Sequence, residues 1–297
     1  MLFAAVLVLV LAGGYARSVW KEKQKQQSAE ILSGIQVDLN VLDSPYAVLL
    51  DSETGQVLAS KRGEERIFPA SMVKMMTVLT AIEEIRDLDA YTEMAYDIYD
   101  ELYAQDASRA GFEPGESVRI RELLYGALLP SGAECCIQLA REAAGSEESF
   151  VAKMNEKAQK LGLAQTNFTN VTGLHDENQY STPHEMGKIL QAALKNKTFY
   201  QVITTHHYAT EPSNIHPDGF TFWSTMFKNM KDEIVNGGEI IAGKTGYTDE
   251  AGHCLASAAK INNRLYILVT AGWAQNTDNS NYHISDAFLA YDQIAPQ

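Results

Sequence analysis

Residues 69–76 read Pro-Ala-Ser-Met-Val-Lys-Met-Met and place Ser71 three positions before Lys74, at the start of an apolar run. Residues three apart share one face of a helix, so the serine hydroxyl and the lysine amine can lie within hydrogen-bond distance. The apolar residues of the run recur at helical spacing, at Met72, Met75, Met76, Leu79 and Ile82. The stretch therefore predicts a helix that begins near Ser71 and carries a nucleophile beside a candidate base.

The same Ser-x-x-Lys spacing occurs at Ser18 to Lys21 and at Ser257 to Lys260, so the spacing alone is a weak signal. Ser18 lies just beyond an apolar N-terminal segment. Ser257 lies in an alternating, strand-like stretch, which would turn its serine and lysine to opposite faces. Only Ser71 opens a helical pattern, and taken alone it is also a good candidate for a simple helix cap.

The composition of the 297-residue chain, 45% hydrophobic and 21% charged, indicates one large globular domain or two ordinary ones. Its 24 basic and 38 acidic residues give a net charge of −14, which argues against nucleic-acid binding because that requires clustered Lys and Arg. The three cysteines, Cys135, Cys136 and Cys254, are interpreted as small buried hydrophobes. Because no CxxC or HExxH motif occurs, we expect no metal and no other cofactor.

The N-terminal residues 2–12 form an almost unbroken apolar run, followed by Gly-Gly-Tyr-Ala. The run is shorter than the roughly 20 residues that span a bilayer, and it fits a signal peptide with a cleavage site after Ala16. We therefore expect residues 1–20 to be a signal peptide or an N-terminal membrane anchor, residues 21–40 to be a polar linker, and the protein to act outside the cytoplasm. Basic residues follow the run instead of preceding it, which predicts a translation start upstream of Met1.

The secondary-structure pattern changes twice along the chain. Two short β-prone runs around a Gly-containing turn predict a first hairpin, at residues 46–50 and 56–59. Helical patterns with recognisable stops follow at residues 121–129, 134–144, 147–161 and 182–194, the last with a capping box of Thr182 and Glu185. Further β-prone runs cover residues 201–210, 239–245, 252–260 and 264–272, and a closing helix is predicted at residues 286–294.

Strands at both ends of the chain with helices between them imply one sheet built from distant segments. The predicted fold is α/β of the α+β type, with an antiparallel β-sheet flanked by helices and an inserted, mostly helical subdomain at about residues 71–198. The last two predicted strands are joined by Asn262-Asn263, a good hairpin turn.

Two further motifs follow Ser71 in a fixed order. Residues 128–134, Leu-Leu-Pro-Ser-Gly-Ala-Glu, put Ser131 on a tight loop between two predicted helices, and residues 243–249, Gly-Lys-Thr-Gly-Tyr-Thr-Asp, end a predicted strand. Ser-x-x-Lys, a second serine motif and Lys-Thr-Gly are the set used by penicillin-binding proteins and class A β-lactamases. Each motif alone has a structural explanation as a cap or a strand end, whereas their conjunction in this order indicates a function.

The chemistry of acyl transfer explains such a set. A serine hydroxyl is a weak nucleophile, and Lys74 can take its proton only as a neutral amine, which burial and the nearby charge of Lys244 would favour. Ser131 would relay a proton to the leaving amine. The glycine at position 246 leaves room for a peptide to lie beside the strand. Backbone N–H groups of the nucleophile and of Tyr247 would form an oxyanion hole.

Through these motifs the chain resembles the serine D-alanyl-D-alanine carboxypeptidases among the low-molecular-mass penicillin-binding proteins. The resemblance runs from about Pro45 to Ala259 and includes residues 47–51, 54–58, 173–175 and 243–252. It implies that residues 41–297 form the catalytic domain, with Ser71 as the acyl-enzyme nucleophile, Lys74 as proton acceptor and Ser131 as proton shuttle. The substrate-binding residues that it implies are Lys244, Thr245, Gly246, Tyr247 and Thr248.

The resemblance also implies an activity and its partners. The expected reaction removes the terminal D-alanine from peptidoglycan stem peptides ending in D-Ala-D-Ala, without a metal, and β-lactam antibiotics are expected to acylate the enzyme as covalent inhibitors. Because the chain ends soon after the catalytic domain, we expect membrane contact to come only from the N-terminal segment. Nucleic acid is not an expected partner.

The sequence departs from the family pattern at two places. Ala133 stands where the second serine motif usually has an asparagine, and residues 223–226, Trp-Ser-Thr-Met, offer only hydroxyls where many relatives carry an arginine or asparagine. Glu134 and Gln138 are candidates to replace the missing amide. Two alternatives therefore stay open, a cell-wall binding protein without turnover and, less favoured, a β-lactamase, for which the glutamate motif of class A enzymes is missing.

Overall fold

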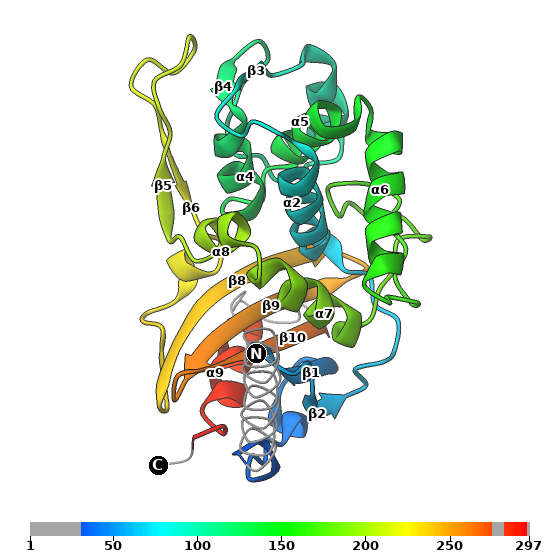
Figure 1. Ribbon diagram of the computed structural model, residues 1–297, viewed down its shortest axis with the longest axis vertical. Helices are drawn as coiled ribbons and strands as arrows, with labels where there is room; N and C mark the ends of the chain where they lie inside the picture. Colours follow the sequence, from blue (N-terminus) through cyan, green and yellow to red (C-terminus); the bar gives the residue numbers. More distant parts are fainter. Residues whose placement is uncertain (1–30, 275–281, 296–297) are drawn as a thin grey trace, which may run out of the picture. The chain divides into compact units, whose positions relative to one another are not determined.

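A six-stranded antiparallel sheet runs through the protein in the order β2-β1-β10-β9-β8-β7 (Figure 1). Its strands come from both ends of the chain: β1 (Tyr46–Asp51), β2 (Val57–Lys61), β7 (Ile234–Val235), β8 (Gly238–Thr248), β9 (Gly252–Ile261) and β10 (Arg264–Trp273). The predicted hairpins β1–β2 and β9–β10 are confirmed. Asn262 and Asn263 turn between β9 and β10 with φ of 49° and 62°, values that asparagine tolerates better than most residues.

The computed structural model describes residues 31–274 and 282–295, and residues 38–297 group as one unit. The predicted signal peptide or anchor at residues 1–20 lies outside the described residues, as does the first half of the predicted linker. Within the described ranges, no helix is long and apolar enough to span a bilayer.

Both faces of the sheet are covered, which explains why β10 is an almost continuous apolar run. Successive side chains of a strand point to opposite faces. Ile267 and Val269 belong to the main core with the helices of the inserted region, whereas the neighbouring Leu268 amide donates to the Tyr291 hydroxyl of α9 (Tyr282–Tyr291). The closing helix is thus confirmed, about four residues earlier than predicted.

The helical region lies between β2 and β7 in the chain. It contains α2 (Val73–Glu84), α3 (Tyr99–Ala104), α4 (Ile120–Leu128), α5 (Ala133–Ala144), α6 (Glu147–Lys160), α7 (Pro183–Leu194) and α8 (Lys197–Ile203), with the small hairpins β3–β4 (Tyr91–Glu93, Ser117–Arg119) and β5–β6 (His207–Ala209, Thr221–Trp223). Helix α2 is buried along nine consecutive residues and contacts α4, α5, α6 and α7. It is the central helix of the region (Figure 1), so the predicted α+β fold with a helical insertion is confirmed.

The predicted strand at residues 201–210 is wrong over its first half. Those residues end helix α8, whose first turn is capped by the Asn196 side chain accepting from the Thr198 and Phe199 amides. Phe199, Val202 and Ile203 are buried, and their three- and four-residue spacing is helical. Burial at that spacing outweighs the β propensity of the Val, Ile and Thr residues, and the true strand β5 is only three residues long.

The predicted capping box of α7 forms only by half. The Thr182 hydroxyl accepts from the Glu185 amide as expected, but the Glu185 carboxylate does not accept from the Thr182 backbone amide. It accepts instead from the Gln165 amide at 3.0 Å and from the Thr166 hydroxyl at 2.6 Å. The glutamate therefore ties α7 to the loop that follows α6.

Candidate active site

Ser71 and Lys74 meet where a single 3-10 turn, Ala70–Met72, leads into α2. Lys74 Nζ lies 2.8 Å from Ser71 Oγ and also donates to the Thr172 carbonyl. The lysine side chain is buried, and burial lowers its pKa below the ordinary 10.5, because a charged ammonium loses its hydration there. A neutral amine at this distance can accept the proton of the serine hydroxyl.

The other two Ser-x-x-Lys matches do not form such a pair among the described residues. Ser257 is buried in β9 beneath α9 and contacts the Tyr291 hydroxyl, whereas Lys260 is exposed. Their alternate orientation is the one that the strand pattern predicted. Ser18 and Lys21 lie outside the described residues.

A second serine and lysine lie beside the first pair. Ser131, on the loop between α4 and α5, has a φ of 70°, and its hydroxyl accepts from Lys244 Nζ of β8 at 2.9 Å. Lys244 is fully buried and also donates to the Thr245 carbonyl. Burial and then the charge of Lys74 lower the pKa of Lys244 well below 10.5. A substrate carboxylate arriving here would reverse that effect, since an anion favours the charged amine.

A cavity of about 360 Å³ contains Ser71 and Ser131 together with hydroxyl, amide and amine groups. The Thr225 and Thr245 hydroxyls are 2.6 Å apart in its wall, and Lys228 and Asn229 from the turn Phe227–Asn229 also line it. The segment 223–226 thus does reach the site, as the sequence indicated. Sequence reasoning missed Lys228 and Asn229, for which the only signal was their position just after that segment.

A second cavity, of about 540 Å³, adjoins the first and shares Ser71, Asp106, Ser108 and Tyr247 with it. Ala133, Thr172, Tyr247 and Thr248 line it, and the loop of residues 105–108 forms part of its wall. Ala133 is the first residue of α5, and its amide donates to the Ser108 carbonyl at 2.8 Å. The alanine that replaces the usual asparagine therefore borders the space in which a substrate peptide would lie.

Neither candidate replacement for the missing amide lines either cavity. Glu134 is fully buried, and its Oε1 accepts from the amides of Ala110 and Gly111 at 2.6 and 3.0 Å. Gln138 contacts the Ala95 amide and the Thr92 hydroxyl. Both residues hold the loops around the site, and the expectation that one of them takes over the asparagine's contacts finds no support in the geometry.

The strand β8 presses against the start of α2. A Cβ added at Gly246 would lie 3.1 Å from both the Ser71 amide nitrogen and the Ala70 Cβ. Only glycine lets the strand pass so close without displacing its neighbour. Along residues 243–248, β8 pairs with β9 on one edge, and no other described strand pairs with the opposite edge. That edge can accept an added peptide strand.

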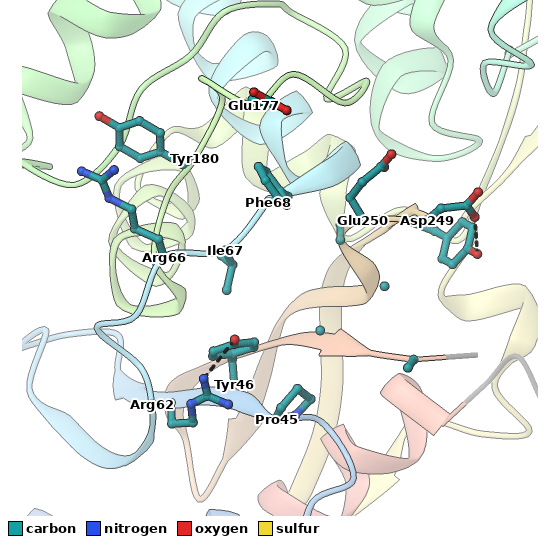
Figure 2. A pocket seen from close by; sticks show the side chains of 15 residues that line it. Pro45, Tyr46, Arg62, Arg66, Ile67, Phe68, Glu177, Tyr180, Asp249 and Glu250 are labelled. Atoms are coloured by element: carbon teal, nitrogen blue, oxygen red, sulfur yellow. Dashed lines mark hydrogen bonds between the residues drawn. The ribbon is translucent and has the colours of Figure 1, made fainter. Parts of the chain in front are cut away.

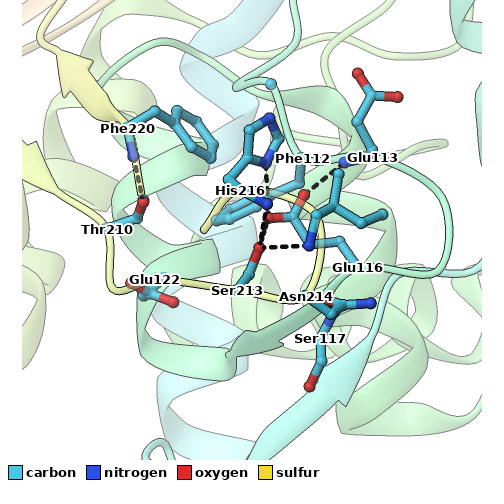
Figure 3. Close-up of polar contacts among 12 residues, drawn as sticks. Phe112, Glu113, Glu116, Ser117, Glu122, Thr210, Ser213, Asn214, His216 and Phe220 are labelled. Atoms are coloured by element: carbon cyan, nitrogen blue, oxygen red, sulfur yellow. Dashed lines mark hydrogen bonds and ion pairs between the residues drawn. The ribbon is translucent and has the colours of Figure 1, made fainter. Parts of the chain in front are cut away.

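The loop that forms the wall near Ser108 is fastened to the β5–β6 hairpin (Figure 3). The buried carboxylate of Glu116 accepts from the Ser213 hydroxyl at 2.6 Å and lies 2.9 Å from His216 Nδ1, both in the hairpin loop. Phe112 and Phe220 pack edge to face at 5.3 Å. These contacts attach residues 112–116 to the hairpin. They thereby hold one end of the loop whose residues 105–108 form part of the active-site wall.

A stacked pair of histidines also lines the smaller cavity. The rings of His253 in β9 and His283 in α9 lie 5.2 Å apart, and His283 is buried. Burial, and then the charge of His253, lowers the pKa of His283 to about 4. Between pH 6.5 and 4 the unfolded chain binds a proton at this residue that the folded protein does not bind, so stability falls as the pH falls through this window.

Replacing His283 with phenylalanine is therefore expected to reduce the acid sensitivity of folding. In urea unfolding, the wild type should lose roughly 2 kcal/mol more than the His283→Phe variant between pH 7 and pH 4.5. The exposed His207 offers a matched control, since His207→Phe should retain the wild-type loss. Equal losses in all three proteins would contradict the assignment.

These contacts define a class of protein. The Ser71 hydroxyl is hydrogen-bonded to a buried lysine amine, and a second serine and lysine lie beside this pair. An open strand edge lies next to them. This arrangement is typical of serine acyl-transferring enzymes that use lysine as the base.

Comparison with known proteins agrees with this class. Residues 34–274 match the peptidase S11 family, D-alanyl-D-alanine carboxypeptidase. The D-alanyl-D-alanine carboxypeptidase DacF of Bacillus subtilis is 30% identical over 272 residues, which are 91% of this chain and 66% of DacF. The D-alanyl-D-alanine carboxypeptidase of Streptomyces K15 is 32% identical over 217 residues, covering 71% of this chain and 74% of that protein.

The solved structures give the same answer for the fold. The crystal structure of the Streptomyces K15 DD-transpeptidase superposes with a TM-score of 0.77 at 27% identity, covering 86% of this chain and 97% of that one. A D-alanyl-D-alanine carboxypeptidase from Mycobacterium tuberculosis superposes with a TM-score of 0.72 at 26% identity, covering 87% and 92%. The chain belongs to the D-alanyl-D-alanine carboxypeptidase family of serine peptidases. It spans just under two thirds of the length of DacF.

Proposed function

We propose that this protein is a serine D-Ala-D-Ala carboxypeptidase, which removes the terminal D-alanine from peptidoglycan stem peptides through an acyl-enzyme on Ser71. The observation that carries the proposal is the pair of contacts from Lys74 to Ser71 and from Lys244 to Ser131, placed around one cavity. Membership of the carboxypeptidase family supports the substrate.

In the proposed reaction, neutral Lys74 takes the proton of Ser71 as its Oγ attacks the carbonyl of the penultimate D-alanine. The developing oxyanion accepts from the backbone N–H groups of Ser71 and Tyr247. Ser131, which accepts from Lys244, relays the proton taken by Lys74 to the nitrogen of the leaving D-alanine, and the C–N bond breaks. Water then attacks the ester, with the same groups acting in reverse, and releases the shortened stem.

The substrate is proposed to bind along β8. The Lys244 amine beside Ser131 and the Thr245 hydroxyl attract the terminal carboxylate, and Lys228 adds charge in the cavity that Ser131 and Thr245 line. Gly246 and Tyr247 leave the strand edge open to the peptide backbone, and Thr248 borders the cavity on the stem side. β-Lactams are proposed to acylate Ser71 as covalent inhibitors. The catalytic domain is proposed to span residues 41–297, with the helical subdomain at about 71–198.

The substrate places the protein outside the cytoplasm, where peptidoglycan lies. We infer that residues 1–20 direct the chain there as a signal peptide or hold it at the outer face of the membrane as an anchor. Fractionation of cells into culture medium, membrane and cytoplasm tests this inference, and a cytoplasmic pool of intact protein would contradict it.

The activity is tested by incubating purified protein with a pentapeptide stem ending in D-Ala-D-Ala and, separately, with a labelled penicillin. We expect D-alanine release and a long-lived penicillin adduct. Rapid drug turnover would identify a β-lactamase instead. Absence of both the adduct and D-alanine would identify a binding protein without turnover.

Restoring the missing amide is expected to improve peptide turnover. The Ala133→Asn variant places hydrogen-bonding groups beside the substrate backbone, and one such contact is worth about 1 kcal/mol, or roughly fivefold in kcat/KM. Ala133→Leu, similar in size but without the amide, is the matched control and should bring no gain. Equal kcat/KM for D-alanine release in the two variants would show that the alanine does not limit recognition.

A further inference from the structure

A third cavity, of about 800 Å³, lies beyond the turn from β8 to β9 (Figure 2). It shares Tyr247, Asp249 and Glu250 with the 540 Å³ cavity beside Ser71, and that cavity shares Ser71 and Tyr247 with the 360 Å³ cavity. The three cavities therefore succeed one another past the end of β8. The carboxypeptidase chemistry proposed above uses only the first two.

The charges of the first cavity set the direction of a bound stem. Its lining includes the Lys228 amine and the Asp106 carboxylate, and the Lys244 amine lies 2.9 Å from Ser131 Oγ in its wall. The two amines favour the terminal carboxylate here, so the earlier residues of the stem extend the other way, toward Glu250. The strand β8 ends at Thr248, and Asp249 and Glu250 lie in the turn that follows, where they line both the second and the third cavity. An extended peptide covers about 7 Å between its scissile residue and the residue two positions before it. Because the second and third cavities share Tyr247, Asp249 and Glu250, a stem that extends past Thr248 is directed toward the third cavity.

The walls of this cavity carry opposite charges. Figure 2 shows Arg62 and Arg66 on one side, Asp249 and Glu250 on the other, and the carboxylate of Glu177 above them. Arg62 is already engaged, with the Glu65 carboxylate at 2.6 Å and the Tyr46 hydroxyl at 3.1 Å. The cavity therefore offers an anion site only where an arginine is not already paired.

Arg66 is that arginine. Its guanidinium stacks over the Tyr180 ring at 4.0 Å, and within residues 31–274 and 282–295 no carboxylate pairs with it. Stacking holds the guanidinium plane while leaving its N–H edge to bind a carboxylate with two hydrogen bonds. The side chain is exposed on the cavity wall, so an incoming ligand can reach it.

We propose that Arg66 binds the free α-carboxylate of a γ-linked D-glutamate at the second position of the stem peptide. A γ-linkage consumes the side-chain carboxyl group, so the α-carboxylate remains as an anion beside the peptide. This assignment rests on the proposed carboxypeptidase function and defines which stems the site prefers. Stems whose second residue is amidated to isoglutamine lose the charge without a change of size and are the poorer ligands.

The test measures binding by isothermal titration calorimetry to the Ser71→Ala protein, which cannot turn the peptide over. Two pentapeptide stems are compared, one with γ-D-glutamate and one with D-isoglutamine at the second position. We expect the charged stem to bind about tenfold more tightly, as a charge-assisted pair at a partly exposed site provides. Adding Arg66→Met should reduce this ratio to about one. Adding Arg86→Met, an exposed arginine that lines none of the three cavities, should leave the ratio at about ten.

Three results would overturn the proposal. They are equal affinity of the two stems for the Ser71→Ala protein, an affinity ratio that falls equally when Arg66→Met or Arg86→Met is added, or no measurable binding of either stem. Thermal unfolding of each variant checks that it is folded. Because binding is measured without turnover, a wild-type protein that releases no D-alanine contradicts the proposed activity alone and leaves the binding result to decide on Arg66.

Discussion

Replacing Lys74 with methionine is expected to lower the rate constant of penicillin acylation about a thousandfold. The lysine amine lies 2.8 Å from Ser71 Oγ, and a positioned base contributes roughly 10²- to 10⁴-fold to such a step. Methionine keeps the length and apolar stem of the side chain but removes the base. Since the lysine is buried, its loss also removes a group that burial penalises, so the variant should remain folded.

The control for this prediction lies in the same protein. Lys260 has the same spacing from Ser257, but its side chain is exposed on β9, so Lys260→Met should acylate at the wild-type rate. The acylation rate of the wild type should rise with pH as Lys74 loses its proton, and because burial lowers the pKa of Lys74, this rise should be complete below pH 10.5. The acylation rates are measured by stopped-flow. If the Lys74→Met variant were acylated by penicillin at the wild-type rate, Lys74 would be excluded as the base.

Replacing Gly173 with alanine is expected to damage both stability and acylation. Gly173 has a φ of 82°, and an added Cβ would lie only 2.0 Å from the Ala70 carbonyl oxygen and 2.9 Å from the Ser71 amide nitrogen. Relief of this clash must move the backbone that carries the nucleophile. A displacement of about 1 Å costs on the order of 100-fold in rate, and we expect at least that loss in acylation.

Gly162 separates the backbone effect from the clash. It also has a positive φ, 71°, but no atom lies within 4 Å of the position of its added Cβ. Gly162→Ala should therefore cost about 1 kcal/mol in urea unfolding, from the left-handed conformation alone, and should acylate normally. Gly173→Ala should lose at least twice as much stability. If the two variants behaved alike, Gly173 would have no specific role in placing Ser71.

The sequence was sufficient to predict features that depend on local periodicity. The helix after Ser71, the first and last hairpins of the sheet, the end of α6 before Gly162 and the Thr182 cap of α7 follow from side-chain spacing or from cap and stop residues, and these are present. Three motifs far apart in the chain were predicted to meet because of a family resemblance. Their meeting could not have been derived from periodicity.

The features that the sequence did not reveal depend on contacts between distant segments. Lys74 donates a hydrogen bond to the backbone carbonyl of Thr172. A backbone acceptor cannot be recognised from the pattern of side chains in a sequence. Lys228 enters the site only because a single turn follows β6. The end of α8, residues 201–203, is predicted as strand because Val202 and Ile203 are β-branched, and the sequence does not show the core against which they pack.

Mass spectrometry of the penicillin-treated protein tests the central claim most directly. After brief labelling and proteolysis, we predict that one peptide, the one containing Ser71, carries the mass of the drug, and that the Ser71→Ala protein carries none on any peptide. The control variant Ser257→Ala, which alters the other described Ser-x-x-Lys match, should label as the wild type does. A drug adduct on any residue other than Ser71, or full labelling of the Ser71→Ala protein, would contradict the account.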